Sequence, residues 1–303
     1  MAATLEVTTK IGCKNACIYC AQDKLALTYS RKSDVVCMSL DTFKRCIDKV
    51  PAGVNINFSG MCEPWLNPEC TAMLLYAHQK GHRIAVFTTL AGMRLSDIDL
   101  FESVPFLDFF VHLPCEEGKE NMAIDKDYLN LLTSVVESSI VNLSFRLHGE
   151  VLPSKIGSII ASRSKDVIRP PLTNRAGSVK AEGIRGLKPR RKSYGCLRNL
   201  RHNVLLPNGD VVLCCMDFGM KHVLGNLLVS DYLSLFSGVE FLKVKGNLKQ
   251  DYGDILCNRC DGFSYNSILS FRTLFYFLVR LGDVRSLRYL RREAVRYLSF
   301  FRK

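Results

Sequence analysis

The first 170 residues alternate short apolar runs with longer segments that carry apolar side chains at helical spacing. The strand-like runs cover residues 4–8, 54–58, 84–88, 107–113, 142–147 and 166–168, and the helix-like segments cover 40–50, 68–80, 96–103 and 125–138. Such alternation predicts βαβ units and a parallel sheet, because parallel neighbours need a crossover connection that is usually a helix. We therefore expect an α/β protein built on a partial (β/α)6 TIM-like barrel, with chemistry on loops at the carboxyl ends of its strands.

The pattern changes near residue 170. A stretch rich in proline, glycine and basic residues follows, and beyond it two apolar runs flank Asn208-Gly209, which is a strong signal for a β-hairpin. We expect a barrel domain over residues 1–172, a connector over 173–193, a small C-terminal domain over 194–266 and a basic helical tail over 267–303.

Composition narrows the setting in which the chain works. No apolar run approaches the ~20 residues of a membrane span, and the polar N-terminus does not resemble a signal peptide, so we expect a cytoplasmic protein. Thirteen cysteines among 303 residues then predict metal or redox chemistry rather than disulfides. The net charge is +12, and residues 271–303 hold nine basic and two acidic side chains, which indicates an anionic partner or a solvated basic surface.

Three cysteines, Cys13, Cys17 and Cys20, follow directly after the first predicted strand. Thiolates are the usual ligands of iron–sulfur clusters and of structural zinc. Zinc normally takes four ligands, so the triad fits zinc poorly. A [4Fe–4S] cluster held by three cysteines fits better, and it leaves one iron open for a small molecule.

The Cys-x3-Cys-x2-Cys spacing, with Tyr19 before the last cysteine, resembles the signature of the radical S-adenosylmethionine (SAM) superfamily. The resemblance implies that the open iron binds the amino and carboxylate groups of SAM, with Tyr19 beside the cofactor. One electron from a reductant such as flavodoxin or ferredoxin then cleaves SAM to a 5′-deoxyadenosyl radical, which abstracts hydrogen from a substrate.

A second motif supports this resemblance. Ser59-Gly60-Met61-Cys62-Glu63-Pro64 is similar to the family's Gly-Gly-Glu-Pro stretch, which implies that Gly60 and Glu63 meet the SAM amino group. Met61 and Cys62 occupy positions where the family usually has glycines. A Cβ at those positions leaves less space for the backbone to approach the ligand closely. The alternative for Glu63 is an ordinary acid at a helix N-terminus.

Polar residues at the ends of the third, fourth and fifth strands extend the predicted site. Thr88 and Thr89 occupy the place of the family's ribose-contacting loop, although its asparagine is missing, and a plain turn is the alternative. The resemblance implies that His112, Arg146 and His148 face SAM or the substrate and are the candidates for catalytic roles. Arg146 suits a carboxylate ligand, whereas either histidine could instead be a hydrogen-bonded structural residue.

A second cysteine group lies in the predicted small domain and consists of Cys196, Cys214, Cys257 and Cys260. It resembles the SPASM/twitch domain, which implies one auxiliary [4Fe–4S] cluster, because no cysteine follows Cys260 to hold another. Cys214 is predicted on the return strand of the hairpin, and Cys215 should point to the opposite face. Structural zinc at the same four thiols is the alternative.

Three functions remain open. Residues 58–69, 110–114 and 202–217 look like segments of small radical SAM proteins of bacterial polysaccharide biosynthesis. This resemblance implies that the enzyme oxidises or remodels a sugar, cyclitol or nucleotide-sugar. A peptide or protein maturase of the SPASM/twitch type is the first alternative. A zinc-dependent or nucleic-acid-binding module is the second, although nucleic acid is disfavoured because the chain holds one tryptophan and no recognisable RNA-binding module.

The tail carries a pattern of its own. Apolar side chains recur at steps of three or four over 283–302, with arginines beside them, which predicts an amphipathic helix. An Arg-rich helix of this kind can lie at an anionic membrane surface, giving the protein a peripheral location. Packing of the apolar stripe on the barrel is the alternative.

Overall fold

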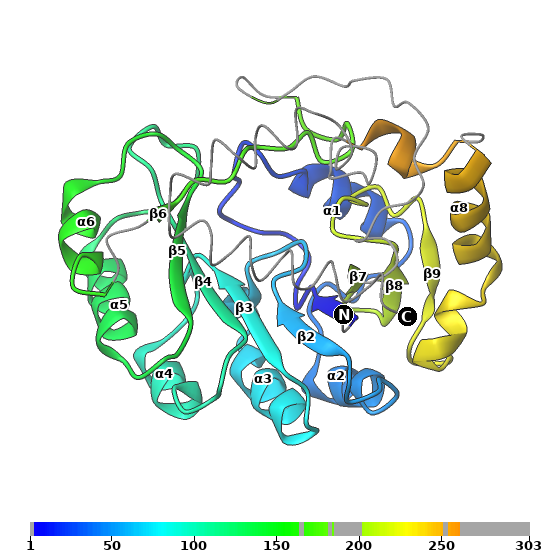
Figure 1. The fold of residues 1–303 in the computed structure, drawn as a ribbon, viewed down its shortest axis with the longest axis horizontal. Coiled ribbons are helices and arrows are strands. Elements are labelled where there is room, and N and C mark those ends of the chain that lie inside the picture. Colours follow the sequence, from blue (N-terminus) through cyan, green and yellow to red (C-terminus); the bar gives the residue numbers. More distant parts are fainter. Residues whose placement is uncertain (1–2, 164–166, 181–183, 185–201, 251–253, 261–303) are drawn as a thin grey trace, which may run out of the picture.

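The computed structural model describes residues 3–163, 167–180, 184, 202–250 and 254–260 (Figure 1). The described strands form one sheet of nine strands in the order β6-β5-β4-β3-β2-β1-β7-β8-β9. They are β1 (Thr4–Val7), β2 (Asn55–Phe58), β3 (Ile84–Thr88), β4 (Asp108–Leu113), β5 (Leu143–Leu147), β6 (Val167–Ile168), β7 (His202–Leu205), β8 (Asp210–Val212) and β9 (Val223–Asn226). Strands β1 to β6 are parallel and in chain order, so the expected partial barrel is confirmed.

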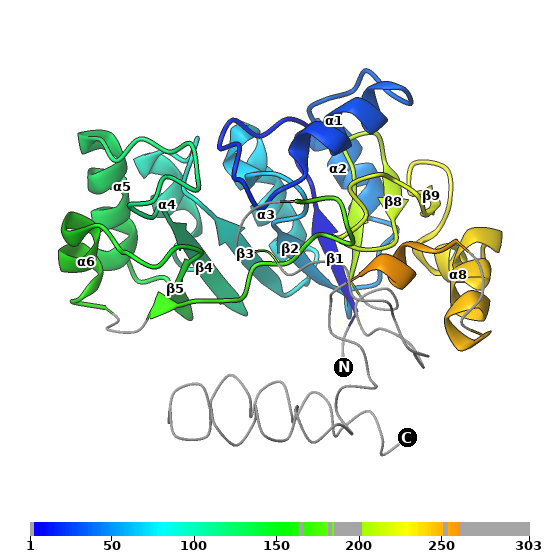
Figure 2. The ribbon, with the colours of Figure 1, turned by 90° about the horizontal axis from the view of Figure 1, so that it is seen from above.

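The helices that connect these strands lie mainly on one side of the sheet (Figures 1 and 2). The helices are α1 (Gln22–Ser30), α2 (Leu40–Ile47), α3 (Cys70–Gln79), α4 (Leu95–Phe101), α5 (Lys126–Glu137), α6 (Ser154–Ile160) and α8 (Val239–Gln250), with 3-10 turns η1 (Pro64–Leu66), η2 (Tyr232–Phe236) and η3 (Leu256–Arg259). Helices α2 to α6 cover the convex face. The periodicity predicted α2 to α5, whereas α1, α6, α8 and β9 were not predicted.

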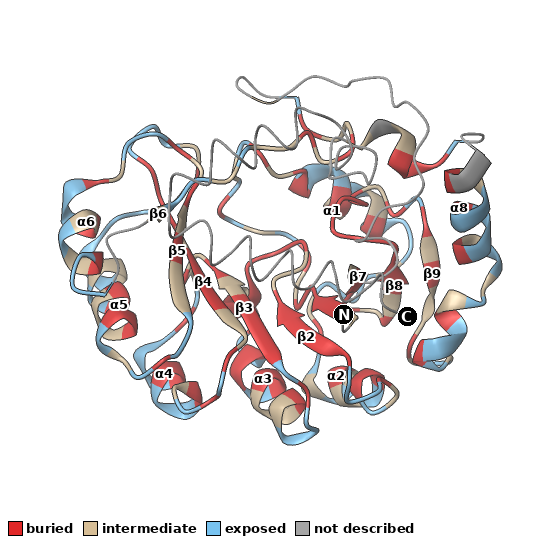
Figure 3. Cartoon of the chain, in the orientation of Figure 1, coloured by how far each residue is buried: buried red, intermediate tan, exposed pale blue. Residues whose placement is uncertain are grey.

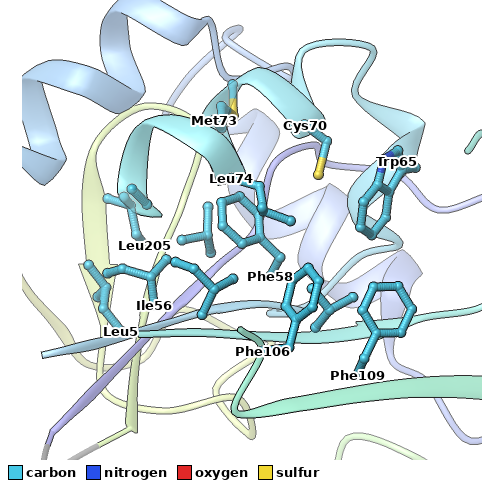
Figure 4. Packing of buried hydrophobic residues seen from close by; sticks show 14 of the residues in the cluster. Leu5, Ile56, Phe58, Trp65, Cys70, Met73, Leu74, Phe106, Phe109 and Leu205 are labelled. Carbon is cyan, nitrogen blue, oxygen red and sulfur yellow. The ribbon is translucent and has the colours of Figure 1, made fainter. Parts of the chain in front are cut away.

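Side chains on the convex face of the strands form the main core (Figure 4). Leu5, Ile56 and Phe58 pack against Met73 and Leu74 of α3, and all five are fully or almost fully buried. Burying side chains of this size contributes about 1.5–3 kcal/mol each. Figure 3 shows the result: β2, β3 and β4 are largely buried, while the outward sides of the helices are exposed. The core therefore holds the helices on the convex face of the sheet, and the concave face remains available for a ligand.

The concave face of the sheet carries several polar side chains, which alternate along the strands with the residues of the core. Glu6 of β1 and Asn57 of β2 share a register position, as do His112 of β4 and Arg146 of β5. Strands that are covered on both faces usually read as continuous apolar runs. The acidic, amide and basic side chains on this face instead provide a surface for a polar ligand.

The predicted hairpin is present and extends the sheet at β1. Strand β7 pairs in parallel with β1, and β8 pairs antiparallel with β7. Gly209 has a φ of +86°, which suits glycine in the tight turn between them. Strand β8 ends at Val212, so Cys214 lies in a turn and not on the return strand as predicted; the Asp217 amide donates to the Cys214 carbonyl at 2.9 Å and closes that turn.

No helix among the described residues is long and apolar enough to cross a membrane. The predicted amphipathic helix over 283–302 lies outside the described residues, and its contact with an anionic surface stays a prediction.

Candidate functional site

Cys13, Cys17 and Cys20 lie together on the loop between β1 and α1. Gly12 and Ala16 have φ values of +86° and +41°, which turn this loop back on itself. Burial, together with the neighbouring Cys20 and Cys13 thiols, raises the pKa of Cys17 to about 12. The three sulfurs are thus close enough to influence one another's charge. Thiols gathered in this way on one short loop fit the ligand set of an iron–sulfur cluster.

No three His, Cys, Asp or Glu side chains in the described part of the chain converge as they would around a single metal ion.

A fourth thiol lies beside the triad. The Cys62 Sγ is 3.9 Å from the Gly12 carbonyl oxygen and 3.5 Å from the Glu63 carbonyl oxygen. Hydrogen bonding from Cys62 is the largest cause that lowers the pKa of Cys13 to about 6. The cysteine that replaces a family glycine is therefore a neighbour of the predicted cluster loop.

Glu63 connects the end of β2 with the end of β3. Thr88 Oγ1 donates to its Oε1 at 2.6 Å, and the amide and hydroxyl of Thr89 donate to its Oε2 at 2.6 and 2.7 Å. Burial raises the pKa of Glu63 to about 7, although these hydrogen bonds favour the ionised form. Glu63 thus joins the two segments that are predicted to bind SAM. The hydroxyl groups of Thr88 and Thr89 both donate their hydrogen bonds to Glu63.

Gly60 has a packing role that the sequence did not predict. Its φ is +54°, and a Cβ at this position would lie 2.3 Å from Thr8 Oγ1 and 2.8 Å from the Thr8 nitrogen. Only glycine allows the loop after β2 to approach the end of β1 so closely. Contact of Gly60 with SAM stays a prediction.

His112, Arg146 and His148 meet on the concave face, at the carboxyl ends of β4 and β5. The two imidazole rings lie 5.3 Å apart, centre to centre. Burial, together with the Arg175 and Arg146 charges, lowers the pKa of His148 to about 4; burial also lowers that of His112. Both histidines are therefore neutral near pH 7, and the buried His112 Nε2 and His148 Nδ1 have no hydrogen-bond partner in the structure. Unpaired buried nitrogens at the mouth of a barrel suit a polar ligand.

Arg146 is held by aromatic rings. Its guanidinium carbon lies 3.8 Å from the centre of the Phe110 ring and 4.7 Å from that of Phe87. Such stacking orients the planar cation. The guanidinium is therefore fixed on the concave face, next to His112 in the register of β4 and β5.

The second cysteine group is partly described. Cys214 packs with Ala176, Met216 and Leu256, and Cys260 borders the same cluster. Burial raises the pKa of Cys214, and the Cys257 thiol is near enough to add to the effect. A cavity of about 290 Å³ adjoins these residues, lined by Lys24, Ala176, Asp217, Gly219, Lys221 and Leu256. Three of the four predicted auxiliary ligands are thus brought together, while Cys196 lies outside the described residues.

Cys215 turns away from this group. It packs in a different cluster, with Leu25 of α1 and with Val204 and Val212 of the hairpin. Cys215 therefore lies away from the predicted auxiliary site. Its surroundings are those of a small core residue.

Comparison with known proteins identifies the fold. Residues 196–261 match the family model of SPASM, an iron–sulfur cluster-binding domain. No curated protein sequence matches the chain. Among solved structures, BtrN in complex with AdoMet and 2-DOIA aligns with a TM-score of 0.61 and 16% identity over 86% of this chain and 94% of BtrN. Native anSMEcpe with bound AdoMet aligns with a TM-score of 0.54 and 13% identity over 92% and 99%.

A third solved structure, Streptococcus suis SuiB bound to its precursor peptide SuiA, aligns with a TM-score of 0.58 and 12% identity over 81% of this chain and 67% of SuiB. The chain has the fold of the radical SAM enzymes of the SPASM/twitch type.

Within the radical SAM fold, one anchor of the cluster loop was missed by sequence reasoning. Tyr19 Oη donates to the buried carboxylate of Glu120 at 2.6 Å, and the Ile18 and Asn121 amides donate to the carbonyls of Lys119 and Asn15 at 3.0 and 2.7 Å. The segment after β4 thereby clamps the loop that carries the three cysteines. Glu120 is a single acidic residue in a loop and belongs to no sequence motif, so the sequence did not predict its contact with Tyr19.

The auxiliary part of the radical SAM fold has its own anchor. The buried His222 accepts at Nε2 from the Leu256 amide at 2.9 Å, and its Nδ1 lies 2.6 Å from Glu240 of α8. Asp217 accepts from the His222 amide at 2.8 Å. This network holds η3, and with it Cys257, against the turn that carries Cys214.

Proposed function

We propose that the protein is a radical SAM enzyme that oxidises or remodels a sugar, cyclitol or nucleotide-sugar. The observation that carries the proposal is the polar concave face below the cluster loop. It combines Glu6 and Asn57 on neighbouring strands with the neutral histidines and the fixed guanidinium at the carboxyl ends of β4 and β5. A ligand with many hydroxyl groups can pair with the two buried histidine nitrogens, which an apolar ligand would leave unpaired.

The proposed cofactors follow from the cysteine groups. The first three cysteines would hold a [4Fe–4S] cluster with an open iron for SAM, and the second group would hold one auxiliary [4Fe–4S] cluster. When bound, SAM and its cluster supply the radical that removes a hydrogen atom from the substrate.

The residues of the chain position and shield the reactants. Glu63, ionised above its raised pKa, accepts a hydrogen bond from the SAM amino group, and Thr88 and Thr89 hold its carboxylate in place. Arg146 pairs with a carboxylate or phosphate, because its guanidinium is already oriented. The neutral His112 and His148 exchange hydrogen bonds with substrate hydroxyl groups. Tyr19 of the cluster loop lies against His148, with the two ring centres 4.4 Å apart, and covers this side of the site.

The alternative function is a peptide maturase. SuiB, which has the same fold, is bound to a precursor peptide, whereas BtrN is bound to 2-DOIA. The chain aligns with nearly the full length of BtrN and with two thirds of SuiB. The near-complete overlap with BtrN supports the first proposal.

Deuterium transfer tests the proposal. Protein with both clusters is reduced by dithionite and incubated with SAM and one of three perdeuterated substrate pools: cyclitols, UDP-sugars or peptides. The deuterium content of the 5′-deoxyadenosine formed is then measured by mass spectrometry. We expect deuterium from a cyclitol or sugar, and none with the Cys20→Ala variant. Deuterium from the peptide pool alone would establish the maturase, and wild-type protein with zinc and no iron would exclude both.

A further inference from the structure

Three consecutive residues of the connector have left-handed backbone conformations. The φ values of Arg175, Ala176 and Gly177 are +46°, +53° and +80°. For a residue with a Cβ this conformation costs about 1–2 kcal/mol, so the surrounding structure must hold it. Asn174, which is buried, accepts at Oδ1 from the Gly177 amide at 3.1 Å and at its carbonyl from the Val179 amide at 3.0 Å. The turn is therefore a built feature of the fold.

The first side chain of the turn reaches the cluster loop. Arg175 Nε donates to the Tyr19 carbonyl at 3.4 Å, and the guanidinium lies 5.9 Å from the centre of the Phe218 ring. This hydrogen bond brings the Arg175 guanidinium to the peptide that joins Tyr19 to Cys20, the last cysteine of the cluster loop. The guanidinium charge contributes to lowering the pKa of His148. Arg175 thus acts electrostatically on the cluster loop and on the mouth of the barrel.

The second side chain of the turn faces the other cysteine group. Ala176 is buried and packs with Cys214, Met216 and Leu256. It also lines the cavity of about 290 Å³ beside them. Two adjacent residues of one turn therefore contact the surroundings of two cysteine groups that lie about 200 residues apart in the chain.

We infer that this turn joins the two iron–sulfur sites, with Arg175 supplying a positive charge to the cluster of Cys13, Cys17 and Cys20, and Ala176 forming a wall of the auxiliary site. The inference rests on the proposed function, since it requires both clusters. A cation near a cluster stabilises its reduced form, which carries one more negative charge, and so raises the reduction potential. The reduced form is the one that cleaves SAM, and Arg175 therefore makes it easier to reach.

Redox titration of the first cluster, followed by electron paramagnetic resonance, tests the role of Arg175. We expect a lower midpoint potential in Arg175→Gln and in Arg175→Met, and a potential near that of wild type in Arg175→Lys, which keeps the charge. Lys24→Gln is the matched control: Lys24 contacts the same turn through Ser178 at 2.9 Å, but it is exposed, so water and salt screen its charge. Unchanged potentials in both neutral variants would overturn the role of Arg175.

The wall formed by Ala176 has a separate test. A β-branched residue is strained at this φ and adds volume beside Cys214, so Ala176→Val should lose about four irons, those of the auxiliary cluster. Ala176→Gly, which suits the conformation, should keep all of them. Retention of all irons by Ala176→Val would overturn this part. Iron-free wild-type protein would instead reject the proposed function, so the two failures are distinguishable.

Discussion

Thr88 Oγ1 donates a hydrogen bond of 2.6 Å to Glu63 Oε1, across 25 residues of sequence. The contact joins the loops after β2 and β3 and fixes the carboxylate beside the cluster loop. It also explains how a buried acid can ionise near neutral pH: burial raises its pKa to about 7, and the hydroxyl donors limit the rise. The protonation state of Glu63 is therefore poised at the pH where the protein is expected to act.

Glu63 should control the pH dependence of SAM binding. A carboxylate accepts a hydrogen bond from the SAM amino group, whereas its protonated form is a poorer acceptor, so binding favours loss of the proton from Glu63. The ratio of wild-type to Glu63→Gln affinity should therefore rise from pH 6 to about pH 7 and level off above it. Deprotonation of SAM itself affects both proteins equally and cancels in the ratio.

Equilibrium dialysis of SAM against cluster-loaded protein gives this ratio. Glu137→Gln, the same change at an exposed position of α5, is the control and should bind as wild type does. A ratio that stays constant with pH would remove Glu63 from the SAM site.

The first cysteine group should account for half of the iron. Anaerobic wild-type protein should hold about eight irons, and the variant with Cys13, Cys17 and Cys20 changed to Ala should hold about four and cleave no SAM. Cys62→Ala is the matched control, because Cys62 neighbours the triad without being assigned as a ligand. Loss of about four irons from Cys62→Ala would show that the ligand set is wrong.

The barrel was predictable because its core residues recur at regular spacing within each strand and helix. Outward residues such as Leu5 and Phe58 alternate with inward polar ones, and α2 to α5 carry apolar stripes that match the convex face. Helix α1 was missed because it follows the cysteine loop and buries only Gln22, Leu25 and Tyr29 of its nine residues. Strand β9 was missed because it is four residues long and contains Gly225, which weakens a strand pattern.

The site was predictable only where its residues share a motif. Cys13, Cys17 and Cys20 lie within eight consecutive residues, so their spacing carried the signal. The pairing of Tyr19 with Glu120 spans 101 residues, and that of Glu63 with Thr88 spans 25, so each depends on the closure of the barrel. Neither contact follows from composition or spacing.

The clamp on the cluster loop should be important for stability. Tyr19→Phe removes the hydroxyl that donates to the buried Glu120, leaving a buried acceptor without its shortest hydrogen bond. Such a loss costs about 1–3 kcal/mol, so the melting temperature should fall and the first cluster should be lost more readily to a chelator. Tyr76→Phe is the control: its hydroxyl donates to Asp48 at 2.7 Å, but on the surface, where water replaces the bond. Equal effects of the two changes would contradict the clamp.

The auxiliary site should depend on Cys214 and not on Cys215. Cys214 packs beside Ala176 and Leu256 next to the cavity, whereas Cys215 packs in the core with Leu25. Cys214→Ala should therefore lose about four irons and unfold at a lower temperature, because the energy of metal binding also stabilises the fold around it. Cys215→Ala makes the same chemical change one residue away and should keep about eight irons, with at most a small loss of stability from a smaller core side chain. Iron analysis and thermal melting of the two variants, each purified without oxygen, decide the matter, and lower iron in Cys215→Ala than in Cys214→Ala would reverse the assignment.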